Sequence, residues 1–184
     1  MANDKRKKAQ DDIITAAIDC ISELGISDTT VRSIANKANV NPAAISYYFG
    51  SRDELIAIAL KITLDNAFDL SDLEIDEADD YRSVLKQVLV DWQRGALAYP
   101  GICHAHFDEV LNDRLNSSVV TDRLIWFIDK VYALLRQHGL EPSEKNHAKL
   151  KIIFGSFISS IIMPKIARPS GIHDNYINLL VEMI

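Results

Sequence analysis

Turn-forming residues are scarce in this chain of 184 residues, which contains 7 glycines and 5 prolines. Long stretches without them argue against a β-sandwich or a β-barrel, whose short strands need frequent turns, and favour an all-helical fold. Cysteine is also rare. Cys20 and Cys103 lie far apart in the sequence among apolar residues, so we interpret them as small buried hydrophobic side chains in a reducing cytosol.

A long apolar run is missing as well. The longest mostly apolar stretch, residues 152–164, covers 13 positions, whereas a helix that spans a bilayer needs about 20. The basic residues near the N-terminus are not followed by the apolar stretch of a secretory signal. We therefore expect a soluble, cytoplasmic protein with no membrane partner.

An excess of positive charge is absent too, because the net charge is −6. Its distribution is uneven. Residues 1–52 carry 7 basic and 6 acidic side chains, whereas residues 53–184 carry 13 basic and 20 acidic ones. Four of the early positive charges form one cluster, Lys5 to Lys8. This asymmetry permits a local nucleic-acid surface on an acidic protein, although a basic N-terminal segment alone is weak evidence for one.

Two short helices joined by a tight turn are the clearest local pattern. Thr29 or Thr30 is suited to cap the first helix, and Asn39 is the best residue after glycine for a turn with positive φ. Asn41 then caps the second helix, with Pro42 at its first position, where the missing N–H does no harm. This order of signals is typical of a helix-turn-helix.

The second helix of such a motif enters the major groove of DNA. Its outer face here is predicted to present Asn41, Pro42, Ala43, Ala44, Ser46, Tyr47 and Tyr48. The tyrosine hydroxyls and Arg52 can reach phosphate oxygens, helped by Thr30 and Arg32 on the preceding helix. Alternatively, the paired tyrosines are core aromatics of an ordinary bundle. We favour DNA contact, because adjacent helical positions cannot both point inward and Phe49 is the better core candidate.

The segment from Ile13 to Leu60 resembles the DNA-binding domain of the TetR family of bacterial transcriptional regulators. The matching features are the apolar helix that ends at Leu24-Gly25, the run from Thr30 to Ala35, Val40, the aromatic pair before Phe49, and the segment from Ser51 to Leu55. The resemblance implies a helical C-terminal domain that forms a homodimer and usually binds a small-molecule effector. It also implies binding to a palindromic DNA operator and, most often, repression that the effector relieves.

Two positions depart from the family pattern. Asn39 stands where glycine is usual, which is physically tolerable, and Ser46 stands where the family often has tyrosine, so one familiar DNA contact is absent or replaced. The run from Pro42 to Ala44 offers few side-chain hydrogen bonds to bases. We therefore expect sequence recognition to depend on apolar contact with thymine methyl groups and on DNA shape.

The rest of the chain carries no motif of comparable strength. We expect residues 1–51 to form the helix-turn-helix DNA-binding domain and residues 52–184 to form a helical effector-binding and dimerisation domain. Seven acidic residues between positions 69 and 80 predict a solvated connection. Six helices are predicted after the first domain, over residues 52–70, 81–99, 101–116, 119–138, 142–163 and 174–184.

Aromatic and histidine side chains of this second domain are the candidate effector contacts, namely Trp92, His104, Phe107 and Trp126. Apolar pockets with few polar groups are usual for small molecules, and no basic cluster indicates a strongly anionic ligand, so we expect a neutral or weakly polar effector. His104 and His106 are two residues apart and diverge on a helix, whereas metal-binding pairs are spaced i, i+4. We expect no metal and no cofactor.

A dimer interface is predicted from two apolar helical faces. Its candidate residues are Ile152, Gly155, Ser156, Ser159 and Met163 on one helix and Ile177, Leu180 and Val181 on the last. Small residues in the first face permit close packing of another helix, and a two-fold dimer suits a palindromic operator. The alternative is that these faces belong to the core of the subunit itself.

Two other functional classes remain open. An enzyme would need a nucleophile with a base, or a metal site, and none of the five histidines lies in a recognisable catalytic context. We therefore predict no catalytic residues. A helical protein–protein adaptor that retains a vestigial DNA-binding head is the second alternative.

Overall fold

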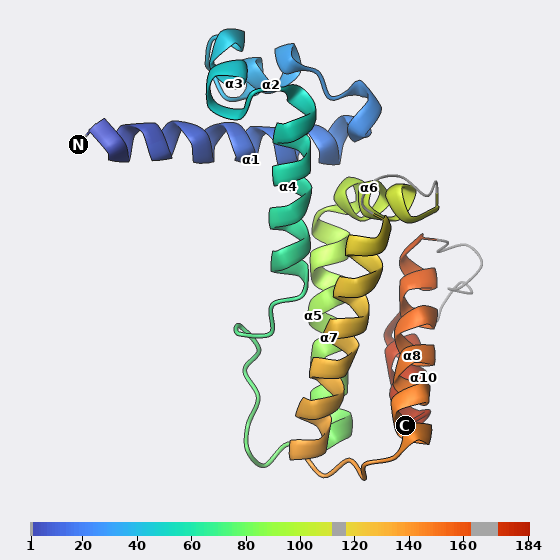
Figure 1. The fold of residues 1–184 in the computed structure, drawn as a ribbon. Coiled ribbons are helices and arrows are strands. Elements are labelled where there is room, and N and C mark those ends of the chain that lie inside the picture. The colour runs from blue at the N-terminus through green and yellow to red at the C-terminus, as the bar shows by residue number, and fades with distance from the viewer. Residues whose placement is uncertain (1, 112–116, 163–172) are drawn as a thin grey trace. The chain divides into compact units, whose positions relative to one another are not determined.

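The computed structural model describes residues 2–111, 117–162 and 173–184. Within these ranges the regular elements are all helices, and no strand is present (Figure 1). This confirms the all-α prediction. None of the described helices is both long enough and apolar enough to cross a membrane.

The chain divides into two compact units. The first consists of Met1–Ala67 and Tyr99–Asn112, and the second of Phe68–Ala98 and Asp113–Ile184. This division differs from the predicted boundary after residue 51, because two later helices pack against the long first helix and so join the N-terminal unit.

The first unit contains five helices, α1 (Ala2–Asp28), α2 (Val31–Lys37), α3 (Pro42–Phe49), α4 (Arg52–Ala67) and α6 (Pro100–Leu111). Helix α1 begins at Ala2, so it includes the basic cluster from Lys5 to Lys8, and its regular geometry is interrupted at Gly25, whose φ is 77°. Helix α6 packs closely on α1. A Cβ atom added to Gly101 would lie 2.0 Å from the carbonyl oxygen of Ser22, so only glycine fits this approach.

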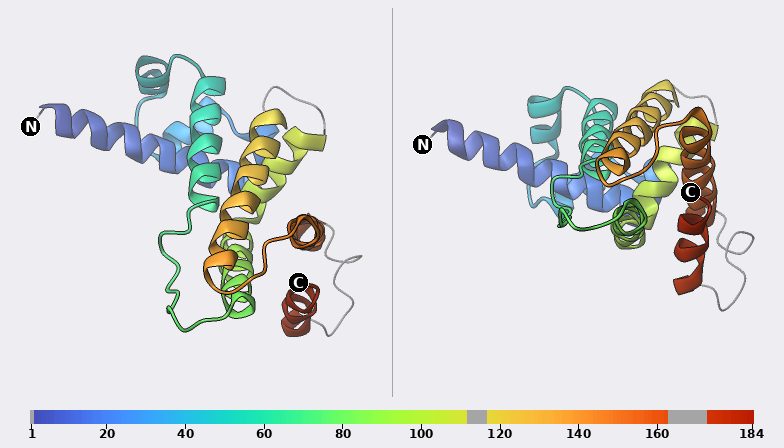
Figure 2. Two further views of the ribbon diagram at one scale, coloured as in Figure 1. Left: turned by 60° about the horizontal axis from the view of Figure 1, so that its bottom comes forward. Right: turned by 90° about the horizontal axis from the view of Figure 1, so that it is seen from below.

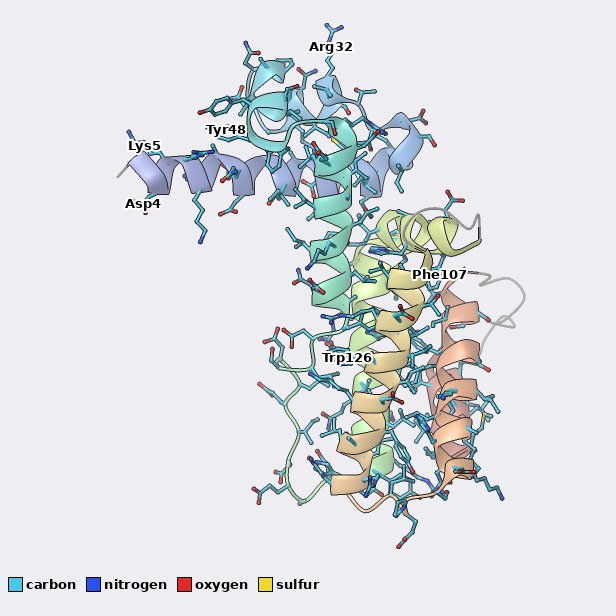
Figure 3. All side chains as sticks on the ribbon, in the orientation of Figure 1. Asp4, Lys5, Arg32, Tyr48, Phe107 and Trp126 are labelled. Carbon is cyan, nitrogen blue, oxygen red and sulfur yellow. The ribbon has the colours of Figure 1, made fainter. Side chains whose placement is uncertain are left out.

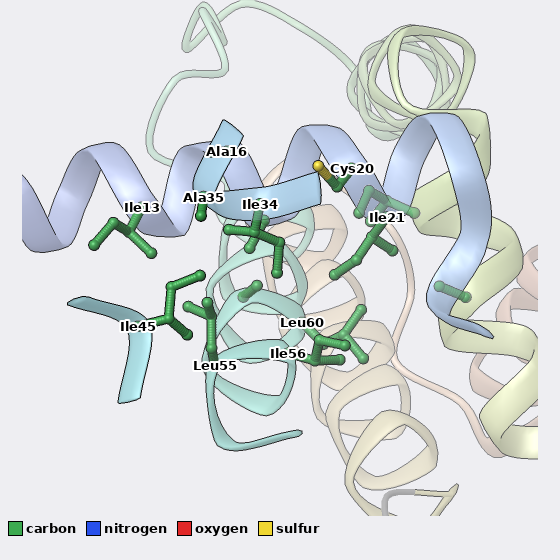
Figure 4. Packing of buried hydrophobic residues seen from close by; sticks show 14 residues of the cluster. Ile13, Ala16, Cys20, Ile21, Ile34, Ala35, Ile45, Leu55, Ile56 and Leu60 are labelled. Atoms are coloured by element: carbon green, nitrogen blue, oxygen red, sulfur yellow. The ribbon is translucent and has the colours of Figure 1, made fainter. Parts of the chain in front are cut away.

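The core of the first unit is formed by aliphatic side chains from all five helices (Figure 4). Ile13 and Ile21 of α1, Ile34 of α2, Ile45 of α3 and Leu55 of α4 are completely buried. Burying such side chains stabilises the folded state by about 1.5–3 kcal/mol each. This core fixes α2 and α3 against α1 and α4.

The second unit contains four helices in its described part, α5 (Tyr81–Ala98), α7 (Ser117–Gln137), α8 (Glu144–Ile162) and α10 (His173–Glu182). Helices α8 and α10 lie side by side, and α10 also packs on α5 (Figure 2). An aromatic cluster occupies the interior, with the ring of Trp92 within 6.0 Å, centre to centre, of Phe68, Phe127, Phe154 and Phe157.

Candidate nucleic-acid interface

Helix α2 begins with a reciprocal cap. The hydroxyl of Thr30 accepts a hydrogen bond from the backbone N–H of Ser33 at 3.0 Å, and the hydroxyl of Ser33 accepts one from the N–H of Thr30 at 2.9 Å. Such a pair satisfies N–H groups that lack partners within the helix. Thr30 is therefore the cap, one of the two residues that the sequence allowed.

The turn between α2 and α3 confirms the helix-turn-helix prediction. Asn39 has a φ of 53°, the left-handed value predicted for it, and the N–H of Val40 donates to the carbonyl of Ala35 at 3.0 Å. This i→i−5 bond closes a helix C-terminus. The side chain of Asn41 then accepts a hydrogen bond from the N–H of Ala43 at 2.9 Å, with Pro42 at the first helical position.

The outward face of α3 is small and polar at its N-terminal half. Ala43 and Ser46 are exposed, and Tyr47 is 72% exposed, which is unusual for an aromatic side chain. Ala44 is half-buried and packs against the core of the first unit, so its side chain is less accessible than the sequence suggested. The exposed face therefore consists of Ala43, Ser46 and Tyr47, together with Asn41 and Pro42 at its N-terminal end.

The two tyrosines differ in environment. The ring of Tyr48 is half-buried against the core, as is Phe49, whereas the neighbouring Tyr47 projects outward. Their ring centres lie 5.0 Å apart in an edge-to-face arrangement, a geometry that aromatic pairs favour. The core interpretation thus applies in part to Tyr48, and Tyr47 is the more accessible of the two.

Basic side chains lie beside this face. Arg32 of α2 is exposed, as are the basic residues of the first turns of α1. Figure 3 shows Lys5 on the side of α1 on which α2 and α3 lie, and Asp4 on the opposite side. Positive charge beside an exposed helix-turn-helix suits a polyanion.

Arg52 is engaged within the protein. Its guanidinium donates hydrogen bonds to the backbone carbonyls of Thr29 and Ile26, and it pairs with the carboxylate of Asp53 at 2.7 Å. The sequence predicted that Arg52 binds phosphate. Ile26 lies 26 residues away in the chain, so no local pattern indicated this contact.

His106 is the polar residue of α6 that sequence reasoning left without a role. It is 8% exposed, and its Nε2 lies 3.0 Å from the hydroxyl oxygen of Thr63 on α4. Because the Thr63 hydroxyl donates to the carbonyl of Leu60 at 2.9 Å, we place the ring proton on Nε2 as the donor to Thr63. Burial lowers the pKa of His106 from 6.5 to about 4.

The four candidate effector contacts lie in different units. His104, which is exposed, and Phe107, which is half-buried, belong to α6 of the first unit, whereas Trp92 and Trp126 belong to the second. Trp126 is 39% exposed, and the cations of Arg123 and Lys130 each lie 4.3 Å from its ring centre. Their roles in effector binding stay predictions. Among the described residues, no group of three His, Cys, Asp or Glu is placed to hold a metal ion.

The two predicted dimer faces have different surroundings. On α8, Ile152 is 56% exposed and Gly155 is exposed, with Ser156 and Ser159 half-buried. On α10, Ile177, Leu180 and Val181 are at most 7% exposed, because α10 packs on α5 and α8 of its own unit. The prediction that these three residues of α10 form the dimer interface therefore needs correction, because they belong to the core of their own unit. The apolar side chains that α10 leaves exposed are Leu179 and Met183. Met163 lies outside the described residues.

Comparison with known proteins identifies the N-terminal segment. Residues 13–58 match the model of bacterial regulatory proteins of the tetR family. The chain is 30% identical over 81 residues to the transcriptional regulator BetI of Stenotrophomonas maltophilia, a match that covers 44% of this chain and 41% of that protein. It is 42% identical over 50 residues to BetI of Brucella anthropi, which covers 27% of this chain and 26% of that protein.

The fold extends beyond the matched segment. A transcriptional regulator from Rhodococcus sp. Rha1 superposes with a TM-score of 0.72 over 95% of both chains, at 18% sequence identity. At this identity the likeness concerns the fold alone. The sequence matches cover less than half the length of the two BetI relatives, so the relatives' functions do not transfer with them. The family-model match and the helix-turn-helix geometry agree, and residues 13–58 carry the N-terminal domain of bacterial regulatory proteins of the tetR family.

Proposed function

We propose that the protein is a transcriptional regulator that binds a palindromic DNA operator as a homodimer and is released from it by a small-molecule effector. The exposed face of α3 is the observation that carries this proposal. Ala43 and Ser46 leave room for base edges to approach, and Tyr47 extends a hydroxyl group away from the core. Small side chains and a hydroxyl suit contacts in a major groove.

The charges of the first unit support the same partner. Arg32 and the cluster from Lys5 to Lys8 are exposed, and phosphate contacts by such side chains supply much of the affinity for DNA. Tyr47 and Tyr48 are proposed to donate their hydroxyl hydrogens to phosphate oxygens, with Thr30 and Asn41 contributing as the caps of the two helices. Such a regulator would act in the bacterial cytoplasm, where the DNA lies.

Selection from a pool of random DNA duplexes tests the proposal. We expect recovered sequences to share two half-sites related by a two-fold axis, with centres about one helical turn or a multiple apart. Binding should weaken steeply with salt, because each phosphate contact contributes about 0.9 to the slope of log K against log salt. Enrichment of no sequence, together with no binding at low salt, would favour a protein–protein adaptor. Turnover of a small molecule by the purified chain would favour an enzyme.

A homodimer is the second part of the proposal. The surface for it combines exposed Ile152 and Gly155 and half-buried Ser159 of α8 with exposed Leu179 and Met183 of α10. Gly155 and Ser159 allow a second helix to approach closely, and the apolar side chains on either side supply area to bury. Two copies of this helix pair would make a self-complementary interface.

Charged substitutions on this surface should produce monomers. We expect the wild-type protein to sediment as a dimer at micromolar concentration, and the double variant Ile152→Asp with Leu179→Asp to sediment as a monomer with an unchanged helical circular dichroism spectrum. Both positions are about half exposed in the single chain, so folding should tolerate the change. Ile177→Asp is the contrasting variant, since it places a charge in the core and should unfold the second unit. A monomeric wild type would contradict the proposal.

Release by an effector is the third part of the proposal. Trp92 lies among four phenylalanine rings in the second unit, surroundings that suit a neutral, apolar ligand. A ligand that enters between these rings must separate side chains that contact each other, and would thereby alter the packing of α5, α7 and α8. It would shift DNA binding only if it binds one arrangement more tightly than the other. His104, Phe107 and Trp126 remain the other proposed contacts.

A further inference from the structure

Arg52 is the first residue of α4, and its side chain returns to the segment that precedes the helix-turn-helix. Its Nε donates to the carbonyl of Thr29, and one terminal nitrogen donates to the carbonyl of Ile26. The other terminal nitrogen contacts Asp53, which is largely solvent-exposed. An exposed ion pair contributes little to stability, so the two carbonyls are the contacts that matter.

These carbonyls belong to the segment between the interruption of α1 and the cap of α2. Helix α1 is interrupted at Gly25, and the chain passes from there to the cap of α2 at Thr30. Thr29 is completely buried, and its hydroxyl donates to the carbonyl of Gly25 at 2.7 Å. Carbonyls at a helix end lack partners within the helix. Arg52 supplies partners for two of them.

An arginine is chemically suited to this position. Its planar guanidinium presents several N–H groups in a fixed arrangement and can bond two acceptors at once, whereas the lysine ammonium is a point charge on a flexible stem. Hydrogen bonds from a charged donor are also stronger than neutral ones. The guanidinium of Arg52, bonded to two carbonyls at once, thus connects the N-terminus of α4 rigidly to the residues just before α2.

We propose that Arg52 is a positioning residue that sets the orientation of α2 and α3 relative to α4, and that it does not bind DNA phosphate. Helix α3 packs on both α2 and α4, so a fixed link between α4 and the start of α2 holds the face of α3 in one orientation. Helix α4 ends at Ala67, directly before the second unit begins. A tilt of α4 would therefore be passed through Arg52 to the DNA-binding face. This inference rests on the proposed binding of DNA.

Arg52→Lys distinguishes phosphate binding from positioning, because it keeps the positive charge and removes the planar guanidinium that bonds two carbonyls at once. A phosphate ligand would tolerate this change. A positioning residue would not, and we expect both Arg52→Lys and Arg52→Ala to lower operator affinity about tenfold or more, since hydrogen bonds to a charged group are lost. Binding to random DNA should fall less, and the salt slope should stay at the wild-type value in both variants, because no phosphate contact is removed.

Arg32 on the neighbouring helix provides the matched control. It is exposed, so Arg32→Ala should lower the salt slope by about 0.9 for each subunit of the dimer, and Arg32→Lys should leave the affinity for DNA nearly unchanged. If Arg52→Ala lowers the slope in the same way while Arg52→Lys binds normally, Arg52 is a phosphate ligand and the inference is wrong. Another outcome would also overturn the inference. If affinity for operator and for random DNA falls by the same factor, and thermal melting shows an unfolded fraction that accounts for this loss, Arg52 only stabilises the fold.

Amide hydrogen exchange gives a readout that does not depend on DNA. We expect the amides of α2 to exchange at least about tenfold faster in Arg52→Lys than in the wild type, with the amides of α6 unchanged, because the link holds α2 specifically. Unchanged exchange in α2 would overturn the inference. If α2 exchanges faster but the wild type binds no DNA, the proposed function fails and the link between α4 and α2 stands.

Discussion

Replacing Ala43 by glutamate is expected to abolish operator binding while leaving the first unit as stable as before. Ala43 is exposed on the outer face of α3, and its N–H is bonded to the Asn41 cap. A carboxylate there would meet the negative charge of the DNA, and like charges brought together in an interface cost several kcal/mol. With tenfold in affinity for each 1.4 kcal/mol, the expected loss is about 100-fold or more.

The fold should survive this change for a separate reason. Ala43 lies in the first turn of α3, where the helix dipole favours negative charge by about 0.3–1 kcal/mol. Loss of binding therefore cannot be attributed to unfolding if the melting temperature is unchanged or slightly raised. Gel-shift titration and thermal melting of the same samples measure the two quantities.

Ala43→Gln is the control for size. Glutamine occupies nearly the same volume as glutamate without its charge, so it should weaken binding much less, through sterics alone. If Ala43→Glu binds operator DNA with wild-type affinity, the face of α3 does not contact DNA. If the glutamine and glutamate variants lose binding equally, the position is sterically closed, and the electrostatic part of the argument is wrong.

The helix-turn-helix was predictable because its signals are local. Asn39, Asn41 and Pro42 each specify a backbone geometry within two or three residues of themselves, through positive φ, side-chain capping and a fixed φ. The structure has these geometries at the predicted positions. The boundaries of α5, α7 and α8 were likewise close to prediction, since the apolar spacing that indicates a helix is local as well.

Contacts between distant segments were not predictable in this way. The bond from Arg52 to Ile26 spans 26 residues, and nothing near Arg52 distinguishes an arginine that reaches solvent from one that reaches a carbonyl. The stripe that contains Ile177 and Leu180 is a further example. Periodicity identified it as an apolar face but could not tell whether the partner is the subunit's own core or a second copy.

The burial of His106 was predictable from the sequence, but its contact partner was not. Ile102 is buried, and His106 follows it at i+4, on the same face of α6. His104 falls on the exposed side of that helix. Helical spacing from Ile102 thus contained a signal that distinguishes the two histidines, although the partner on α4 could not be read from it.

His106 should make the stability of the first unit depend on pH in one direction. Its pKa in the folded protein is about 4, against 6.5 when it is exposed, because burial disfavours the charged ring. Between these two values the unfolded chain binds a proton that the folded protein does not. The free energy of unfolding is therefore greatest above pH 6.5 and falls as the pH is lowered, by up to about 3 kcal/mol near pH 4.

His106→Gln isolates this contribution. A glutamine amide can donate to Thr63 as Nε2 does, and it does not titrate, so the variant should lose stability more slowly than the wild type between pH 6.5 and 4.5. Carboxylates also titrate toward the lower end of this range in both proteins, so the difference between the two denaturation curves is the quantity to compare. We expect that difference to grow by about 1.4 kcal/mol for each pH unit below 6. Parallel curves would mean that His106 is accessible to protons in the folded state, and would contradict its burial against Thr63.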